Sequence, residues 1–282
     1  MDMLVSTDWL AGELGADDLV VLDASAHLPD SGIDAAREYA AAHIPGARFL
    51  DLPGFFDPES PVPKAVPTRR QFEERLRSLG IAETTRVVLY DASKLRSSAR
   101  AWLIFDRFGF GRVAILDGGF EKWRAEDRPV ESGEPETKAA EYRSEIDVPE
   151  GIRSKAEMLE NCETRAEQVV DARDADRFTA ASDDAVHGLA GGHIPGARNL
   201  FFRDLLNADG TFREPDALRR AFEDAGIDPA GPLVATCGSG VTASVVLFAH
   251  RLLGHDHGAL YDGSWAEWGA DPETPKEGGP AL

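Results

Sequence analysis

One cysteine stands in a setting that suits nucleophilic chemistry. The stretch LVATCGSGVTASVV, residues 233–246, puts Cys237 between an apolar run and a loop of small residues. Beyond the loop, residues 243–253 have the apolar spacing of a buried helix, so Cys237 lies where a predicted strand passes into a predicted helix. The thiolate is the nucleophilic form of cysteine, so such a thiol needs surroundings that favour its ionisation.

The loop after Cys237 supplies such surroundings. Gly238, Ser239 and Gly240 can curl tightly, so that successive backbone N–H groups face one concavity. The positive end of the following helix points there as well. The alternative is an inert buried cysteine at a strand end, a frequent role for this residue. The loop composition favours a reactive thiol.

The chain contains the same domain twice. AHIPGAR at residues 42–48 returns as GHIPGAR at 192–198, 150 positions later. Three further pairs follow in the same order: LVVLDAS with QVVDAR, RVVLYDAS with PLVATCGS, and AILDGGFEKW with ALYDGSWAEW. A repeat of this length indicates a duplicated domain rather than a solenoid. We predict domains at 1–130 and 151–282, joined by a linker at 131–150 that is rich in charge, Pro and Gly.

Each half is predicted to be an α/β domain. Short β-branched runs alternate with helical segments, two of which end at Gly80 and Gly226, and this alternation indicates a mostly parallel sheet with helices on both faces. Ligands of such sheets bind at the carboxyl ends of the strands, where Cys237 lies. The first half has Asp91 at the equivalent position. Only the second half therefore carries a nucleophile.

Together the HIPGAR, DG(G/S)…W, VVDAR and CGSGVTAS segments resemble the tandem-domain rhodanese family of sulfurtransferases over nearly the whole chain. The resemblance implies an inactive first half and a catalytic second half with a persulfide on Cys237. The sulfur would come from a small anionic donor and pass to a thiol or cyanide acceptor, with no metal or organic cofactor.

The CGSGVT loop resembles that of 3-mercaptopyruvate sulfurtransferases, whereas thiosulfate sulfurtransferases carry a more basic loop. We therefore predict 3-mercaptopyruvate as the preferred donor. Two alternatives stay open: a thiosulfate:cyanide sulfurtransferase, and a sulfur-carrier module that docks a thiolation partner without turnover. A cysteine phosphatase is disfavoured, because the position six residues after Cys237 is Ala243 rather than the arginine that would hold phosphate.

The resemblance also implies a set of site residues. The catalytic candidates are Cys237, Ser239 and His43, and the substrate-binding candidates are Arg177, Arg173, Gly238, Gly240, Val241 and Thr242. Arg177 is favoured as the anion binder, and Arg173 as a structural ion pair. The family pattern has another arginine where this chain has Val186, which leaves His187 or another cation as the substitute.

Five histidines and one cysteine have weaker claims to function. His43 either partners Ser239 in proton transfer or, like its twin His193, braces its loop by hydrogen bonds. His250, His255 and His257 are expected to be solvated histidines at a helix end rather than a metal site. Cys162, on a charged helical segment, is expected to be inert.

The charge balance limits the partners. The chain has 30 basic and 50 acidic residues and a net charge of −20, which argues against binding to nucleic acid or an anionic membrane. Its apolar runs are shorter than the roughly 20 residues that a bilayer span needs. With two cysteines and no evident secretory signal, we expect a reduced, cytoplasmic location.

The acidic surface predicts a dependence on salt. Because 50 acidic residues outnumber 30 basic residues, negative side chains repel one another in the compact state. Salt screens this repulsion, as in proteins of high-salt cytoplasm. We expect the melting temperature to rise between low and molar potassium chloride in thermal unfolding measurements. A melting temperature that does not change with salt would contradict this adaptation.

Overall fold

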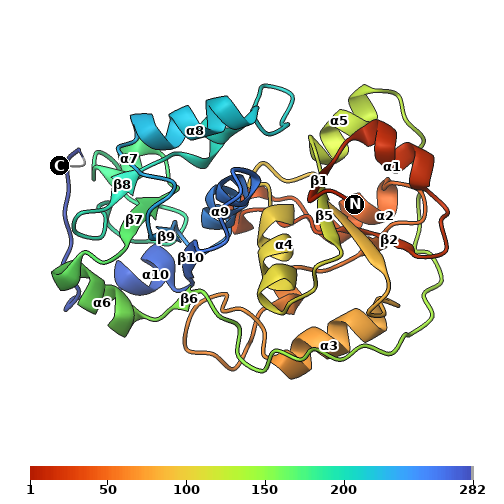
Figure 1. Cartoon of the computed structure of the whole chain (residues 1–282), viewed down its shortest axis with the longest axis horizontal. Helices are drawn as coiled ribbons and strands as arrows, with labels where there is room; N and C mark the ends of the chain where they lie inside the picture. The colour runs from red at the N-terminus through yellow and green to blue at the C-terminus, as the bar shows by residue number, and fades with distance from the viewer. Residues whose placement is uncertain (281–282) are drawn as a thin grey trace. The chain divides into compact units, whose positions relative to one another are not determined.

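The computed structural model describes residues 1–280 and divides into two compact units (Figure 1). The first comprises Met1–Asp57, Val66–Glu150 and Ala208–Thr211. The second comprises Pro58–Ala65, Gly151–Asn207 and the chain from Phe212 onward. The second half begins near the predicted position, but the expected linker 131–150 is grouped with the first unit.

The first unit contains a five-stranded parallel sheet in the order β1-β5-β4-β2-β3. Its strands are β1 (Leu4–Val5), β2 (Leu19–Asp23), β3 (Arg48–Phe49), β4 (Arg86–Tyr90) and β5 (Val113–Leu116). Its helices are α1 (Thr7–Glu13), η1 (Pro29–Ser31), α2 (Ala35–Ala41), η2 (Pro53–Phe55), α3 (Arg69–Ser78), α4 (Ser98–Arg107) and α5 (Gly119–Ala125). Leu10 of α1 and Trp123 of α5 share one core cluster with Val88 of β4. Phe72 of α3 and Phe105 of α4 are also buried and lie edge to face, with ring centroids 5.5 Å apart.

The second unit repeats this topology in the order β6-β10-β9-β7-β8, again with parallel pairing. Its strands are β6 (Ile152–Arg153), β7 (Gln168–Asp171), β8 (Arg198–Asn199), β9 (Leu233–Thr236) and β10 (Ala259–Tyr261). Its helices are α6 (Lys155–Thr164), α7 (Ala175–Phe178), η3 (Phe202–Leu205), α8 (Pro215–Asp224), α9 (Ala243–Leu252) and α10 (Ser264–Trp268). The predicted α/β class and the duplication are confirmed.

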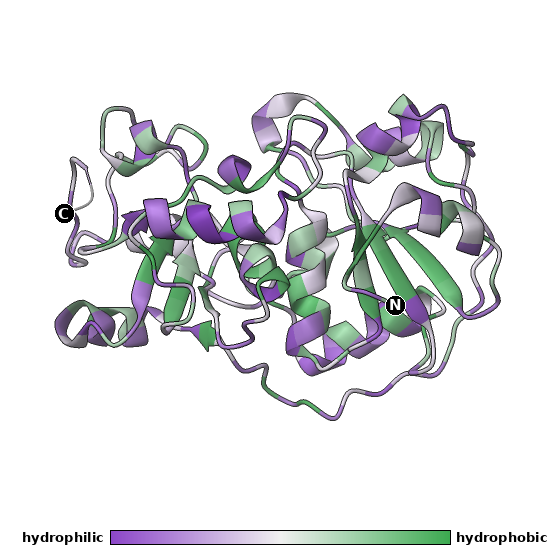
Figure 2. Cartoon of the chain, turned by 45° about the horizontal axis from the view of Figure 1, so that its top comes forward, coloured by the Kyte–Doolittle hydropathy of each residue, from purple (hydrophilic) through white to green (hydrophobic). Residues whose placement is uncertain are grey.

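Local sequence signals explain these elements. Apart from the two-residue strands β3, β6 and β8, which each contain an arginine, the strands are mostly apolar and buried. The long strands of the first unit stand out as hydrophobic in Figure 2. The helices α3 and α8 end before Gly80 and Gly226, which have φ of 68° and 73°, as the sequence predicts. Capping boxes begin α3, at Thr68, and α6, at Ser154. No helix within residues 1–280 combines the length and the apolar character that a membrane crossing requires.

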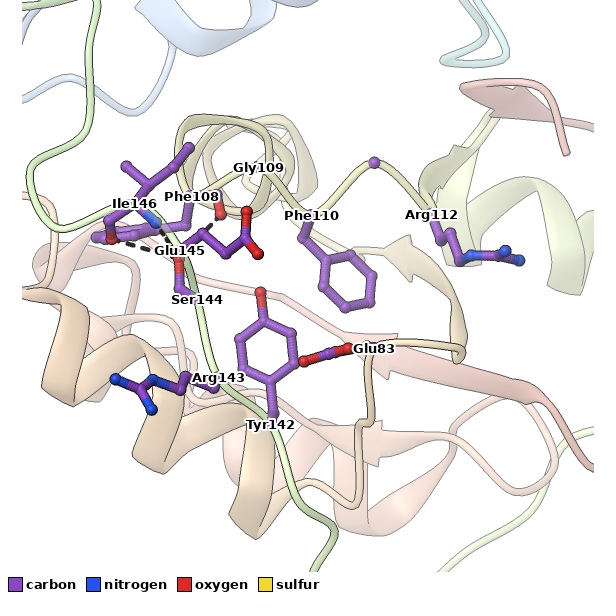
Figure 3. A pocket seen from close by; sticks show the side chains of 11 residues that line it. Glu83, Phe108, Gly109, Phe110, Arg112, Tyr142, Arg143, Ser144, Glu145 and Ile146 are labelled. Atoms are coloured by element: carbon purple, nitrogen blue, oxygen red, sulfur yellow. Dashed lines mark hydrogen bonds between the residues drawn. The ribbon is translucent and has the colours of Figure 1, made fainter.

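The segment 131–150 packs on the first unit because it contains a buried aromatic residue. Tyr142 lies edge-on to Phe72, with ring centroids 5.8 Å apart, and its carbonyl accepts a hydrogen bond from Arg77. A pocket of about 680 Å³ opens beside Tyr142, Phe108 and Phe110 (Figure 3). None of the predicted site residues lines it.

Candidate functional site

Cys237 directly follows β9, the middle strand of the second sheet, and is 2% exposed. The start of α10 holds its backbone in place. The Cys237 N–H donates to Ser264 Oγ over 3.2 Å, and the Trp265 N–H donates to the Cys237 carbonyl over 3.0 Å. The Ala266 N–H likewise donates to the Gly238 carbonyl over 2.9 Å. The thiol therefore sits at the carboxyl end of a parallel strand on a fixed backbone, as expected.

The loop that follows Cys237 is a backbone nest. Gly240 has φ of 77°, and its carbonyl accepts from Ser244 Oγ of α9 over 2.8 Å. Among the described residues, the backbone N–H groups of 238–242 donate to no protein acceptor, although residues 238–241 are buried. Buried N–H groups at the start of a helix suit an anion such as a persulfide or a donor oxygen.

Arg173 lies at the centre of a buried ion-pair network. Its guanidinium is 2.6 Å from Asp171, 3.4 Å from Asp184 and 4.5 Å from the centre of the Trp265 ring. Burial opposes the charge of Arg173, but Asp171, Asp184 and, in part, Cys237 outweigh it and raise the pKa of Arg173. These contacts favour a structural and electrostatic role over direct substrate binding.

Arg177 is the more open of the two arginines, with a side chain that is 23% exposed. Its Nε lies 2.6 Å from Asp174, which caps α7, and its Nη1 lies 3.6 Å from Asp184. Part of this side chain reaches solvent, so Arg177 is better placed than the buried Arg173 to meet a soluble anion.

His187 lies directly beside the loop. Its Nδ1 is 2.9 Å from Asp184, and a Cβ on Gly238 would come within 2.3 Å of its Cε1. Gly238 is therefore needed for this close approach. Reciprocal backbone hydrogen bonds between Asp184 and Leu189 form the turn that carries His187, on which Val186 also lies.

Asp184 is a functional candidate that the sequence analysis missed. It is fully buried and joins Arg173, Arg177 and His187. Burial raises its pKa, but these three basic groups outweigh burial and hold the pKa of Asp184 below its usual value. In the sequence, the one indication of such a role is that Asp184 lies two positions before Val186, where the family pattern has an arginine.

Lys64 was also missed. It belongs to the segment Pro58–Ala65, which is grouped with the second unit, and its Nζ donates to Ser239 Oγ over 3.2 Å. The loop itself is neutral, but a lysine from a distant part of the sequence thus gives it a cation. The Pro-rich context of Lys64 contained no signal for this contact.

His43 and His193 occupy equivalent, buried positions in their own units. Each Nδ1 lies 2.8 Å from a backbone carbonyl, of Tyr39 and Phe178 respectively. Each ring also stacks on the side chain of that same residue. The twin contacts support a loop-bracing role for both histidines. A proton role for His43 stays a prediction.

Asp91 replaces the nucleophile in the first unit. Its carboxylate accepts backbone hydrogen bonds from Ser93 over 2.9 Å and from Ser98 over 3.0 Å. Complete burial raises the pKa of Asp91, although Arg96 and these bonds oppose that shift. Here the loop is organised around a fixed carboxylate instead of a thiol.

Two of the weaker candidates have distinct outcomes. Burial raises the pKa of the Cys162 thiol, in agreement with an inert residue. The expectation of solvated histidines is wrong for His250, which is 1% exposed and lies in a cluster with His255 and His257. His250 is buried because it belongs to the part of α9, residues 243–250, that is buried throughout.

The chain is similar over nearly its full length to proteins of known activity. A family model for the rhodanese-like domain matches residues 6–126 and 154–271. The 3-mercaptopyruvate sulfurtransferase of Rattus norvegicus is 41% identical over 271 residues, covering 94% of this chain and 91% of the relative. The thiosulfate sulfurtransferase of Cricetulus griseus is 38% identical, with 96% and 94% covered. The crystal structure of SseA, a 3-mercaptopyruvate sulfotransferase of Escherichia coli, matches with a TM-score of 0.84 at 34% identity, covering 94% of this chain and 99% of that chain.

Proposed function

We propose, from the premise that the chain belongs to the rhodanese-like family and is a sulfurtransferase, that it takes sulfur preferentially from 3-mercaptopyruvate. The sulfur then passes through a persulfide on Cys237 to a thiol or cyanide acceptor. The observation that carries this proposal is the neutral nest of N–H groups at residues 238–242, which begins directly after a buried thiol.

The reaction has two half-steps. The Cys237 thiolate attacks the sulfur of 3-mercaptopyruvate, an S–S bond forms, the C–S bond breaks, and pyruvate leaves as its enolate and takes up a proton. An acceptor thiolate or cyanide then attacks the outer sulfur, and the S–S bond breaks to return the Cys237 thiolate. The nest of N–H groups stabilises the anionic persulfide between the two steps.

The basic residues around the loop would bind the donor. Arg177 offers a partly exposed guanidinium for the carboxylate of 3-mercaptopyruvate. His187, adjacent to Gly238, would supply the cation that is absent at Val186. Arg173 would act as a positioning residue, because its ion pairs fix Asp184 and hence the orientation of His187.

A second donor has one specific observation in its favour. The contact of Lys64 with Ser239 puts a cation beside the loop, which would compensate the sulfonate end of thiosulfate. Thiosulfate:cyanide sulfurtransfer is therefore the second candidate. A carrier module without turnover would form the persulfide but give no steady-state rate.

Donor preference tests the proposal. We expect kcat/KM for 3-mercaptopyruvate to exceed that for thiosulfate when both are measured with one acceptor in high salt. His187→Gln should raise KM for 3-mercaptopyruvate about ten- to hundredfold, since a charge-assisted hydrogen bond contributes about 1.5–3 kcal/mol. Lys64→Met should instead reduce mainly the thiosulfate rate.

Lys94→Met is the matched control, because Lys94 is exposed and lies in the equivalent loop of the first unit. It should change neither rate. A wild-type ratio that favours thiosulfate tenfold would reverse the assignment of donor, and a persulfide without turnover would support the carrier.

The reactive thiol and the net charge indicate the compartment and the partners of the protein. A free, reactive thiol persists in reducing compartments, so we propose a cytoplasmic location. The net charge of −20 disfavours nucleic acid and anionic membranes as partners and favours small, diffusible donors and acceptors.

A further inference from the structure

Three histidines meet near the amino-terminal end of β9, at the opposite end of that strand from Cys237. His250 is in the last turns of α9, and His255 and His257 follow in the connection to β10. One ligand nitrogen from each lies within 4.8 Å of the others. Cys237 follows the carboxyl end of β9, whereas this cluster contacts the turn that precedes β9. The cluster is therefore separate from the sulfur-transfer site.

Hydrogen bonds fix which nitrogens are available in two of these rings. His250 Nε2 lies 2.7 Å from the Pro229 carbonyl, and His257 Nε2 lies 3.2 Å from the Gly231 carbonyl. A carbonyl only accepts, so each Nε2 carries the proton and each Nδ1 keeps a lone pair. Histidine ligands of metals characteristically donate their other N–H to such a carbonyl.

The third ring has an unexplained nitrogen. His255 Nε2 is buried and has no hydrogen-bond partner among the described residues. Its ring stacks on His250, with centroids 4.8 Å apart. A buried, unpaired nitrogen beside two oriented imidazoles points to a missing ligand.

We propose that His250, His255 and His257 bind a divalent transition metal ion, with Zn²⁺ as the occupant. Imidazole is a preferred ligand of Zn²⁺, and three protein ligands leave a fourth position for water. Zinc–nitrogen bonds of about 2.0–2.1 Å bring the ligand nitrogens closer to one another than the 4.8 Å within which they lie here. His255 and His257 are in a loop between Gly254 and Gly258, which allows that adjustment. The metal would link the end of α9 to the loop at 253–258, and the Nε2 hydrogen bonds of His250 and His257 would connect it to the turn at 229–231.

The test uses Co²⁺ and Zn²⁺ with the full chain, in a Cys162→Ser, Cys237→Ser background that removes competing thiolates. We expect one equivalent of Co²⁺ with visible d–d absorption, its displacement by Zn²⁺, and a higher melting temperature with Zn²⁺. His255→Gln and His257→Gln should each lower the affinity at least about tenfold. His27→Gln is the matched control, because His27 pairs with Glu38 in the first unit and should leave affinity unchanged.

Unchanged affinity in both His255→Gln and His257→Gln, or no binding by the parent protein, would overturn the proposal. If these variants fail to fold, anomalous diffraction from Zn²⁺-soaked crystals of the chain with all three histidines intact tests the site directly. A peak between the three rings supports the site, and a map without a peak there contradicts it.

Discussion

Cys237→Ala is expected to form no persulfide and to lose sulfur transfer entirely. The thiol follows the middle strand of the second sheet and is followed by N–H groups that have no protein acceptor in the described residues. The other side chains of the loop that could act as nucleophiles are the hydroxyls of Ser239 and Thr242, which are far weaker nucleophiles than a thiolate. Alanine keeps the backbone bonds to Ser264 and Trp265, so the fold should be preserved.

Intact-protein mass spectrometry after treatment with the donor measures the effect. The parent protein should gain the mass of one sulfur, and Cys237→Ala should gain none. Cys162→Ala should retain both the mass gain and the rate, because burial raises the pKa of that thiol and makes it a poor nucleophile. A one-sulfur gain that persists in Cys237→Ala would show that another residue carries the sulfur.

Asp91→Ala serves as the control in the equivalent loop of the first unit. It should leave the rate per folded molecule unchanged, since that loop has no nucleophile. Unlike a surface change, it should lower the free energy of unfolding by about 1–3 kcal/mol, because two backbone N–H groups lose their acceptor. Rate and stability must therefore be measured together on this variant.

The repeats explain why the fold was predictable. A duplicated pattern of β-branched runs and helices allows few arrangements, and the segment around Cys237 contains its strand, its loop and its helix within a few residues. Local signals also placed the glycine-terminated helices correctly. The features that depend on residues close together in the sequence could therefore be predicted.

The residues that were missed depend on contacts between distant segments. Lys64 reaches Ser239 from 175 positions away, and Asp184 is significant only because three basic side chains converge on it. The segment 131–150 has the charge and proline content of a linker, and nothing in that composition indicates that Tyr142 packs on Phe72. No periodicity or motif encodes such pairings, which follow from how the sheet and its loops bring chain segments together.

The largest expected loss of stability comes from Arg173→Met. Its guanidinium forms an ion pair with Asp171 and a longer one with Asp184, and both carboxylates are at most 1% exposed. Removal of the cation leaves buried negative charge uncompensated, which costs about 3–5 kcal/mol. The Gly192 carbonyl and the Trp265 ring also lose their contacts with it. Urea unfolding, compared with the parent protein at one salt concentration, measures this loss.

Arg177→Met is the matched control, because Arg177 pairs with Asp174 and Asp184 but is partly exposed. Exposed ion pairs contribute little, so it should lose less than about 1 kcal/mol of stability and instead raise KM for 3-mercaptopyruvate. The double variant Arg173→Met, Asp171→Asn should recover part of the stability, since it also removes one buried charge. If Arg173→Met unfolds at the same urea concentration as the parent while its KM rises, then Arg173 contacts the donor directly and its structural role is refuted. The opposite pattern, a large loss of stability with a KM per folded molecule that rises no further than in His187→Gln, would support the positioning role of Arg173 and leave Arg177 and His187 as the residues that bind the donor.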